Sequence, residues 1–335
     1  MTKPAPAPSH HPSRRWSYYR RIFSAYLTPA TSHLTFWHEP PEANDNASAA
    51  ELGEYYMPFL QKADYVGPCD GAGIPLLDYR GTLGLQYNPI AIAQYGLGNY
   101  NAWRRSGDAQ HRGKFLAAAD WLLAHLEQNS RGLWVWNHHF DWEYRTTLKA
   151  PWYSGLAQGQ GVSLLVRAHA ATGNTAYADA AQRALQPLLH EVSDGGVCVR
   201  DEHGRLWLEE YIVDPPTHIL NGFLWTTWGV YDYWLATRDA AARALFDSAV
   251  ETLAAALPSY DTGYWSLYEH SGTRMKMLAS PFYHRLHIVQ LRVMHRLTGK
   301  AEFQQYAERW EGYRTRWSHR QRALLYKTVF KLLYY

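Results

Sequence analysis

The chain has 335 residues, of which 47% are hydrophobic and 19% charged, so it can bury a large core as an ordinary globular protein. Its net charge is only +3 and its cations are spread along the sequence, which argues against nucleic acid as a partner. No apolar run reaches the roughly 20 residues that a membrane span needs. Two cysteines are too few for a disulfide framework and favour a reducing compartment, so we expect a cytoplasmic location.

The two ends of the chain differ from its middle. Residues 1–11 are rich in Pro, Ala and His, which is typical of a disordered tail, and residues 40–46 form a polar linker. Residues 14–23 and 322–335 mix cations with aromatic side chains. Each mixed segment could pack on the body as a helix with solvated cations, or lie on an anionic membrane surface, and the sequence leaves both readings open. We therefore expect an arm and linker (1–50), a main domain (51–317) and a basic-aromatic C-terminal helix (318–335).

A turn of the form Ser/Thr, then Gly or Arg, then a polar residue recurs four times after residue 100. The last residues of these turns are Asp108, Asn174, Asp239 and Lys300, at steps of 66, 65 and 61. Apolar residues recur at three and four around each turn, which predicts a helix on either side. The expected pairs are 89–105 with 110–128, 156–171 with 174–191, 217–236 with 239–257, and 283–297 with 300–316.

A period of this size predicts a mainly α protein, an (α/α) barrel-like toroid of repeated helix pairs. Segment 51–87 is rich in turns and could hold short strands. Alternating, aromatic or β-branched stretches between the pairs predict short β-hairpins, at residues 132–137, 196–200 with 206–211, and 263–268. These connections should lie together at one rim of the toroid. We expect the polar functional side chains at this rim, where they can contact an extended ligand.

Three groups of side chains near this rim could carry chemistry. Glu209, Glu210 and Tyr211 end one predicted strand, and Tyr268 ends another. Tyr283 begins a predicted helix beside two histidines and an arginine, surroundings in which a phenol ionises more easily. A solvated strand end and an amphipathic first turn with core histidines are the plainer explanations, and the pattern alone does not separate them.

Other polar helix starts are expected to face the same rim. The glycines of residues 152–161 fit close helix packing better than phosphate binding, since no dinucleotide-binding strand precedes them. The histidines at 138–139 and at 284 and 287 lack a matching carboxylate or cysteine spacing, so we expect no metal. Aromatic residues make up 15% of the chain, a surplus that suits a groove stacking on sugar rings.

Several motifs together resemble a known family, the C-terminal domain of the D-glucuronyl C5-epimerases, which act on heparosan or heparan sulfate. They are residues 87–97, 152–160, 209–211, 220–223 and 260–263 with Tyr268. The resemblance covers residues 55–316 in order and with matching spacing, and it implies an (α/α) barrel-like domain. It also implies that the proposed catalytic groups of the family fall on Glu210, Tyr211, Tyr268 and Tyr283.

The resemblance has departures. The animal enzymes read Trp-Asp where this chain has Pro281 and Phe282, and Ile212 replaces a proline. We expect no counterpart of their large N-terminal β domain and membrane anchor, on which dimerisation depends. A homodimer and peripheral membrane contact through the termini stay open.

The implied reaction inverts carbon 5 of a glucuronate within a polysaccharide, by removing a proton from one face and returning one to the other. Tyr283 is expected to serve one face and Glu210 with Tyr211 the other, while Tyr268 orients or relays. Cations must hold the substrate carboxylate as negative charge builds, and no organic cofactor is needed. The expected donors are Arg145, Lys149, His284 and Arg285, and the expected sugar contacts are Tyr87, Asn88, Tyr153, Gln158 and Asn221.

Two other classes of function stay open on the residues alone. A uronate polysaccharide lyase begins with the same abstraction and then expels the group at carbon 4, whereas a glycoside hydrolase needs two carboxylates at a defined separation. A binding module without activity on the same polymer is the third reading.

Overall fold

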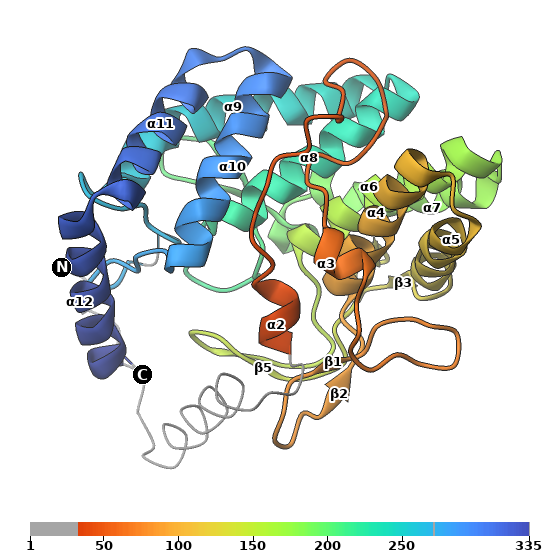
Figure 1. The fold of residues 1–335 in the computed structure, drawn as a ribbon, viewed down its shortest axis with the longest axis horizontal. Helices are drawn as coiled ribbons and strands as arrows, with labels where there is room; N and C mark the ends of the chain where they lie inside the picture. The colour runs from red at the N-terminus through yellow and green to blue at the C-terminus, as the bar shows by residue number, and fades with distance from the viewer. Residues whose placement is uncertain (1–32, 271, 335) are drawn as a thin grey trace.

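Four helical hairpins form the body of the protein in the computed structural model, which describes residues 33–270 and 272–334 (Figure 1). The predicted helix pairs are confirmed, with ends that shift by a few residues. They are α4 (Pro89–Ser106) with α5 (Ala109–Ala124), α6 (Gly155–Thr172) with α7 (Thr175–Leu189), α8 (Leu220–Thr237) with α9 (Ala240–Tyr260), and α10 (Pro281–Thr298) with α11 (Ala301–Thr315).

The first helix of each pair lies inside and the second outside, as the predicted (α/α) toroid requires. Every residue of α6 from Gly155 to Ala168 is buried, whereas α7 buries a single stripe. The inner helices contact one another in the order α4, α6, α8, α10. Between α10 and α4 run α2 (His33–Trp37) and α3 (Leu60–Ala63), with the chain that joins them (Figure 1). The fold is therefore an arc of helix pairs with an N-terminal segment across its opening.

The recurring turn motif has one role for each of its residues, as the second turn illustrates. Gly173 ends α6 in the left-handed conformation at φ 72° and donates its N–H to His169 O. The Thr172 hydroxyl accepts the N–H of Asn174 at 3.2 Å, and the Asn174 side chain caps α7. Gly107, Arg238 and Gly299 adopt the same left-handed conformation at the other three turns. The repeat in the sequence thus corresponds to a repeated helix end in the structure.

Close packing of α6 against α8 explains two of the glycines. A Cβ atom at Gly229 would lie 2.1 Å from the carbonyl oxygen of Gly159, and one at Gly159 would lie 2.6 Å from the Cα of Thr226. Two backbones can approach this closely only where no side chain intervenes. The prediction that the glycines of residues 152–161 serve packing is confirmed for Gly159, and Gly229 is its partner on α8.

The short strands pair only with their sequence neighbours. The hairpin of β7 (Cys198–Arg200) with β8 (Leu206–Leu208) was predicted, and so was β4 (Trp134–Val135), but its partner β3 (Glu127–Gln128) lies where the sequence predicted the end of a helix. Two further pairs are β1 (Leu77–Asp78) with β2 (Leu85–Gln86) and β5 (Trp142–Glu143) with β6 (Thr147–Leu148).

The strand predicted over residues 263–268 is wrong. The segment begins with a tight turn, in which the Thr262 hydroxyl accepts the N–H of Trp265 at 3.0 Å. Tyr268 then donates its N–H to Met277 O at 2.8 Å, and two isolated bridges, Asp261 with Ser266 and Leu267 with Leu278, replace a regular strand.

Residues 33–56 are fixed to the body, although the sequence predicts an arm and a linker up to residue 50. Asn44 is buried and accepts hydrogen bonds from Arg105 and Arg296, and Tyr231 donates to Ala49 O. The cationic run at residues 14–23 lies outside the described residues. The division of the chain into domains stays a prediction.

The helix α12 (Trp317–Tyr334) ends the chain. None of the helices in the described residues is long and apolar enough to cross a membrane.

The cap geometry predicts opposite effects for one substitution at two exposed glycines. Gly173→Ala should lower the free energy of unfolding by about 1–2 kcal/mol, because alanine is strained at positive φ. Gly113→Ala, in the middle of α5, should raise it by about 0.5–1 kcal/mol, because alanine is the better helix former. Neither added Cβ meets another atom within 4 Å, so urea unfolding of both variants isolates the backbone effect. Equal shifts in the two variants would contradict this role of the turn.

Candidate active site

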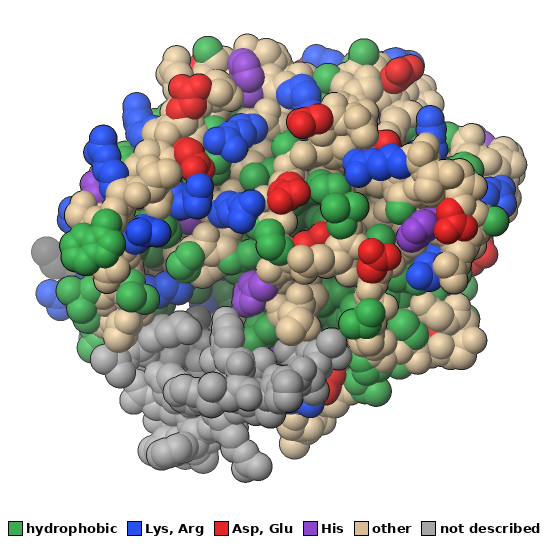
Figure 2. Space-filling view, viewed as in Figure 1, with side chains coloured by type: hydrophobic (Ala, Val, Ile, Leu, Met, Phe, Trp, Pro, Cys, Tyr) green, Lys and Arg blue, Asp and Glu red, His purple; other side chains and the backbone are tan. Residues whose placement is uncertain are grey.

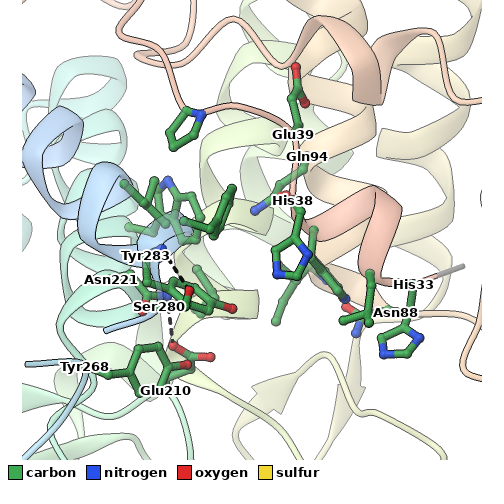
Figure 3. A pocket seen from close by; sticks show the side chains of 18 of the residues that line it. His33, His38, Glu39, Asn88, Gln94, Glu210, Asn221, Tyr268, Ser280 and Tyr283 are labelled. Atoms are coloured by element: carbon green, nitrogen blue, oxygen red, sulfur yellow. Dashed lines mark hydrogen bonds between the residues drawn. The ribbon is translucent and has the colours of Figure 1, made fainter. Parts of the chain in front are cut away.

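A cavity of about 360 Å³ lies where the inner helices α4, α8 and α10 begin (Figure 3). Its wall includes all four residues expected to be catalytic, Glu210, Tyr211, Tyr268 and Tyr283, together with Asn88 and Asn221. These residues come from a strand end, a loop and three helix starts. The structure thus brings together groups that are almost 200 residues apart in sequence.

Glycine contacts place Glu210 in this wall. The N–H of Gly155, at the start of α6, donates to Glu209 O at 2.9 Å. A Cβ atom at Gly222 would lie 2.6 Å from the Cβ of Glu210, so the carboxyl group fits against α8 only because residue 222 has no side chain. Asn221 then donates to Glu210 Oε2 at 3.4 Å (Figure 3).

The surroundings of Glu210 favour its neutral form. Burial raises the pKa of Glu210 to about 8, the carboxylates of Glu269 and Glu209 add to this rise, and a hydrogen bond with Tyr211 opposes it. Burial, followed by the charge of Glu210, also holds the pKa of Tyr211 and of Tyr268 well above the usual value. At neutral pH this group of side chains is therefore rich in protons, and any base formed in it is a strong one.

The phenol rings stand in contact beside Glu210. The rings of Tyr268 and Tyr283 meet edge to face with centroids 4.8 Å apart. Ser280 accepts the N–H of Tyr283 at 3.2 Å, which fixes this tyrosine in the first turn of α10 (Figure 3). On the other side, Tyr211 lies between Tyr144 and Trp152.

Besides Glu209 and Glu210, a third buried carboxylate, Glu269, was missed by sequence reasoning and is 1% exposed. It accepts hydrogen bonds from Arg145 Nε at 2.9 Å and from the Tyr144 hydroxyl. Its position directly after Tyr268 was a usable signal. The turn that supplies Tyr144 and Arg145 carried no strand pattern that could reveal it.

Two lysines that the sequence did not single out line the cavity. Lys62 is 5% exposed and its Nζ donates to Phe36 O at 2.6 Å. Burial lowers the pKa of Lys62 to about 8 although Glu39 raises it, so the amine is still mostly charged at neutral pH. Lys327 reaches the cavity from α12.

Of the expected carboxylate donors, none lines the cavity. Arg145 is held on Glu269, and Lys149 is exposed and pairs with Asp141. Arg285 lies in a neighbouring groove, 3.9 Å from Glu42.

The fourth expected donor, His284, stacks on Trp265 with centroids 3.8 Å apart and bonds Trp310 O. Burial lowers its pKa to about 3, so it carries no charge at neutral pH. For His284 the plainer explanation, a core histidine, matches its position.

Only some of the expected sugar contacts line the cavity. Asn88 and Asn221 line the cavity, whereas Gln158 is buried among backbone groups and accepts the N–H of Trp136 at 2.9 Å. Tyr87 donates to Asp70 and Tyr153 donates to Gly195 O, both outside the cavity.

Several buried polar atoms of the cavity wall have no hydrogen-bond partner among the described residues. Apart from Glu39 Oε2, which forms an ion pair with Lys62, they are Gln94 Oε1, His138 Nε2, Asn221 Oδ1 and Trp225 Nε1. Burial lowers the pKa of His138 to about 3, so its Nε2 is available as an acceptor while Nδ1 lies 3.3 Å from Trp152 O. Buried polar groups are rarely left unpaired. These three acceptors and one donor can therefore form hydrogen bonds with a ligand that carries hydroxyl groups.

The raised pKa of Glu210 predicts a pH effect on stability. Between about 4.5 and 8, the folded state holds a proton that the unfolded chain has lost, so stability falls as pH rises through this range. Glu210→Gln should remove this part of the fall, by up to a few kcal/mol at about 1.4 kcal/mol per pKa unit. Urea unfolding at both ends of the range measures it. The exposed Glu51→Gln is the control, and a decline in Glu210→Gln as steep as in the wild type would contradict the prediction.

Comparisons with known proteins show which family the chain resembles. Residues 128–312 match the family described as D-glucuronyl C5-epimerase C-terminus. The D-glucuronyl C5-epimerase of Caenorhabditis elegans is 34% identical over 221 residues, which are 61% of this chain and 35% of that protein. A protein of Methanocaldococcus jannaschii is 28% identical over 207 residues, 59% of this chain and 66% of its own length. The chain thus spans less than two thirds of either relative.

Solved structures show only a weak likeness. An unsaturated glucuronyl hydrolase from Bacillus sp. GL1 has a TM-score of 0.45 at 16% identity, over 66% of this chain and 60% of that one. A beta-1,3-1,4-glucanase from Paenibacillus sp. X4 has a TM-score of 0.43 at 12% identity, over 94% and 96%. Neither bears on the reaction of this chain. Because the family match covers more than half of its residues, the chain belongs to the D-glucuronyl C5-epimerase family, in the part described as the C-terminus.

Proposed function

We propose that the protein is an isomerase that inverts carbon 5 of D-glucuronate to L-iduronate within a heparosan-like polysaccharide. The observation that carries the proposal is the buried carboxyl group of Glu210, with a pKa of about 8, in one cavity wall with three tyrosines. Membership of the epimerase family supports it. The unpaired acceptors Gln94, His138 and Asn221 support a substrate rich in hydroxyl groups.

The reaction needs a base on one face of the sugar and an acid on the other. A base takes the proton at carbon 5, and the electron pair of the broken C–H bond moves into the adjacent carboxylate to form an enediolate. An acid on the opposite face then returns a proton to carbon 5, with inverted configuration. We assign one face to Tyr283 and the other to Glu210 with Tyr211, and a relay role to Tyr268.

The local charges suit both steps. The high pKa of Glu210 makes its carboxylate a stronger base than an ordinary glutamate, while a fraction of it is still ionised at neutral pH. The enediolate carries a second negative charge, which needs cations or hydrogen-bond donors. Lys62 and Lys327 line the cavity and are the candidates for this role, in place of the cations expected from sequence.

No observation favours a hydrolase. Of the other buried carboxylates beside Glu210, Glu269 is occupied by Arg145 and Tyr144, and Glu209 by His218. A lyase would share the first step, and its unsaturated product distinguishes it from an epimerase. A homodimer and a cytoplasmic location stay predictions.

Deuterium exchange tests the proposal. The protein incubated with heparosan in deuterated water should introduce deuterium at carbon 5, measured by mass spectrometry and by proton NMR of iduronate. Tyr283→Phe should slow the exchange by at least about 100-fold, the usual loss when a proton-transfer group is removed. Tyr87→Phe, which alters a phenol outside the cavity, is the matched control and should exchange at the wild-type rate.

Three results would contradict the proposal. Full exchange by Tyr283→Phe would remove this tyrosine from the reaction. A rise in ultraviolet absorbance from an unsaturated uronate would identify a lyase. Binding of heparosan without exchange by the wild type would identify a binding module.

A further inference from the structure

The C-terminal helix α12 combines positive charge with exposed apolar side chains. After Glu311 the sequence contains no acidic residue, and it carries six cations. Arg314 and Arg316 precede α12, where Arg314 pairs with Glu311, and Arg320, Arg322, Lys327 and Lys331 lie within the helix. No other part of the chain of this length has such an unbalanced charge.

The outward side of α12 is unusually apolar. Its exposed side chains include Trp317 at 68%, Leu324 at 61%, Leu325 at 68%, Val329 at 40% and Leu333 at 59%. The helix buries its opposite side through Ala323 and Phe330. In Figure 2, apolar side chains alternate with cations along α12, at the left edge of the view.

We propose that α12 docks the protein on an anionic membrane surface, lying in the plane of the interface. A helix of this kind sinks its large apolar side chains into the boundary between headgroups and acyl chains, while its exposed cations, here Arg320 and Arg322, bind anionic headgroups. Several cations close to the surface add to the attraction, which salt screens. The inference does not depend on the proposed reaction.

The composition of α12 disfavours other occupants. A second copy of this chain would bring two sets of cations together without an acidic residue between them. A polyanion such as nucleic acid or polysaccharide needs the cations but leaves the exposed Leu324 and Leu325 in water. An anionic lipid surface satisfies both features at once.

Docking would also orient the candidate active site. Lys327 and Phe330 lie on the side of α12 that faces the body, and both line the cavity. One side of α12 therefore forms part of the cavity wall, while the other side exposes the leucines. A protein attached through α12 would hold this wall of its cavity within a helix diameter, about 10 Å, of the membrane surface.

Vesicle cosedimentation tests the inference with the full chain. It should bind vesicles of equal parts phosphatidylglycerol and phosphatidylcholine, and should not bind phosphatidylcholine alone or in high salt. The double variant Leu324→Gln with Leu325→Gln should bind at least about tenfold more weakly, since two buried leucines are lost from the interface. Val66→Gln with Leu85→Gln removes two exposed apolar side chains elsewhere, and should bind like the wild type.

Unchanged binding by the α12 variant, or equal binding to neutral vesicles, would overturn the proposal. Light scattering of the free protein gives a second reading. If the wild type is a dimer and the α12 variant a monomer, the apolar side serves self-association and the membrane proposal fails. Because Leu324 and Leu325 do not line the cavity, the variant should keep its thermal midpoint and its exchange rate on soluble heparosan.

Discussion

The absence of side chains at a few glycines is the constraint on which the site depends. Gly159 and Gly229 let the backbones of α6 and α8 touch, and Gly222 makes room for the carboxyl group of Glu210. With alanine at residue 222, either the strand end or the helix start would have to move. Glu210 is thus buried as a consequence of how the inner helices pack, and its pKa follows from that burial.

The same burial explains why the site costs stability. Burial opposes the ionisation of Glu210, and Gln94 Oε1 and His138 Nε2 have no hydrogen-bond partner among the described residues. Folding tolerates these costs because the surrounding core is large, and a bound sugar would relieve part of them. Lys62, which is almost buried in the same cavity wall, is likewise costly to bury, although Glu39 and Phe36 O partner its amine.

The fold could be predicted from sequence because its signals are local. A left-handed residue ends the inner helix at all four turns, Asp108, Asn174 and Asp239 cap the next helix at three of them, and helix periodicity surrounds them. The motif residues of the cavity wall could be named from their resemblance to a family. Glu269 and Lys62 could not, because their roles arise from contacts with residues far along the chain. Arg145, Lys149 and Arg285 were chosen by charge, which does not reveal which side a side chain faces.

The central claim is that carbon 5 of a glucuronate lies between Tyr283 and the pair of Glu210 and Tyr211. A crystal structure of the Tyr283→Phe variant with a bound heparosan oligosaccharide tests this most directly. The claim predicts a glucuronate in the cavity with carbon 5 within about 3.5 Å of Glu210 or Tyr211 on one face, and the ring of residue 283 on the other. A sugar that presents carbon 5 to neither side, or that binds outside the cavity, would contradict it.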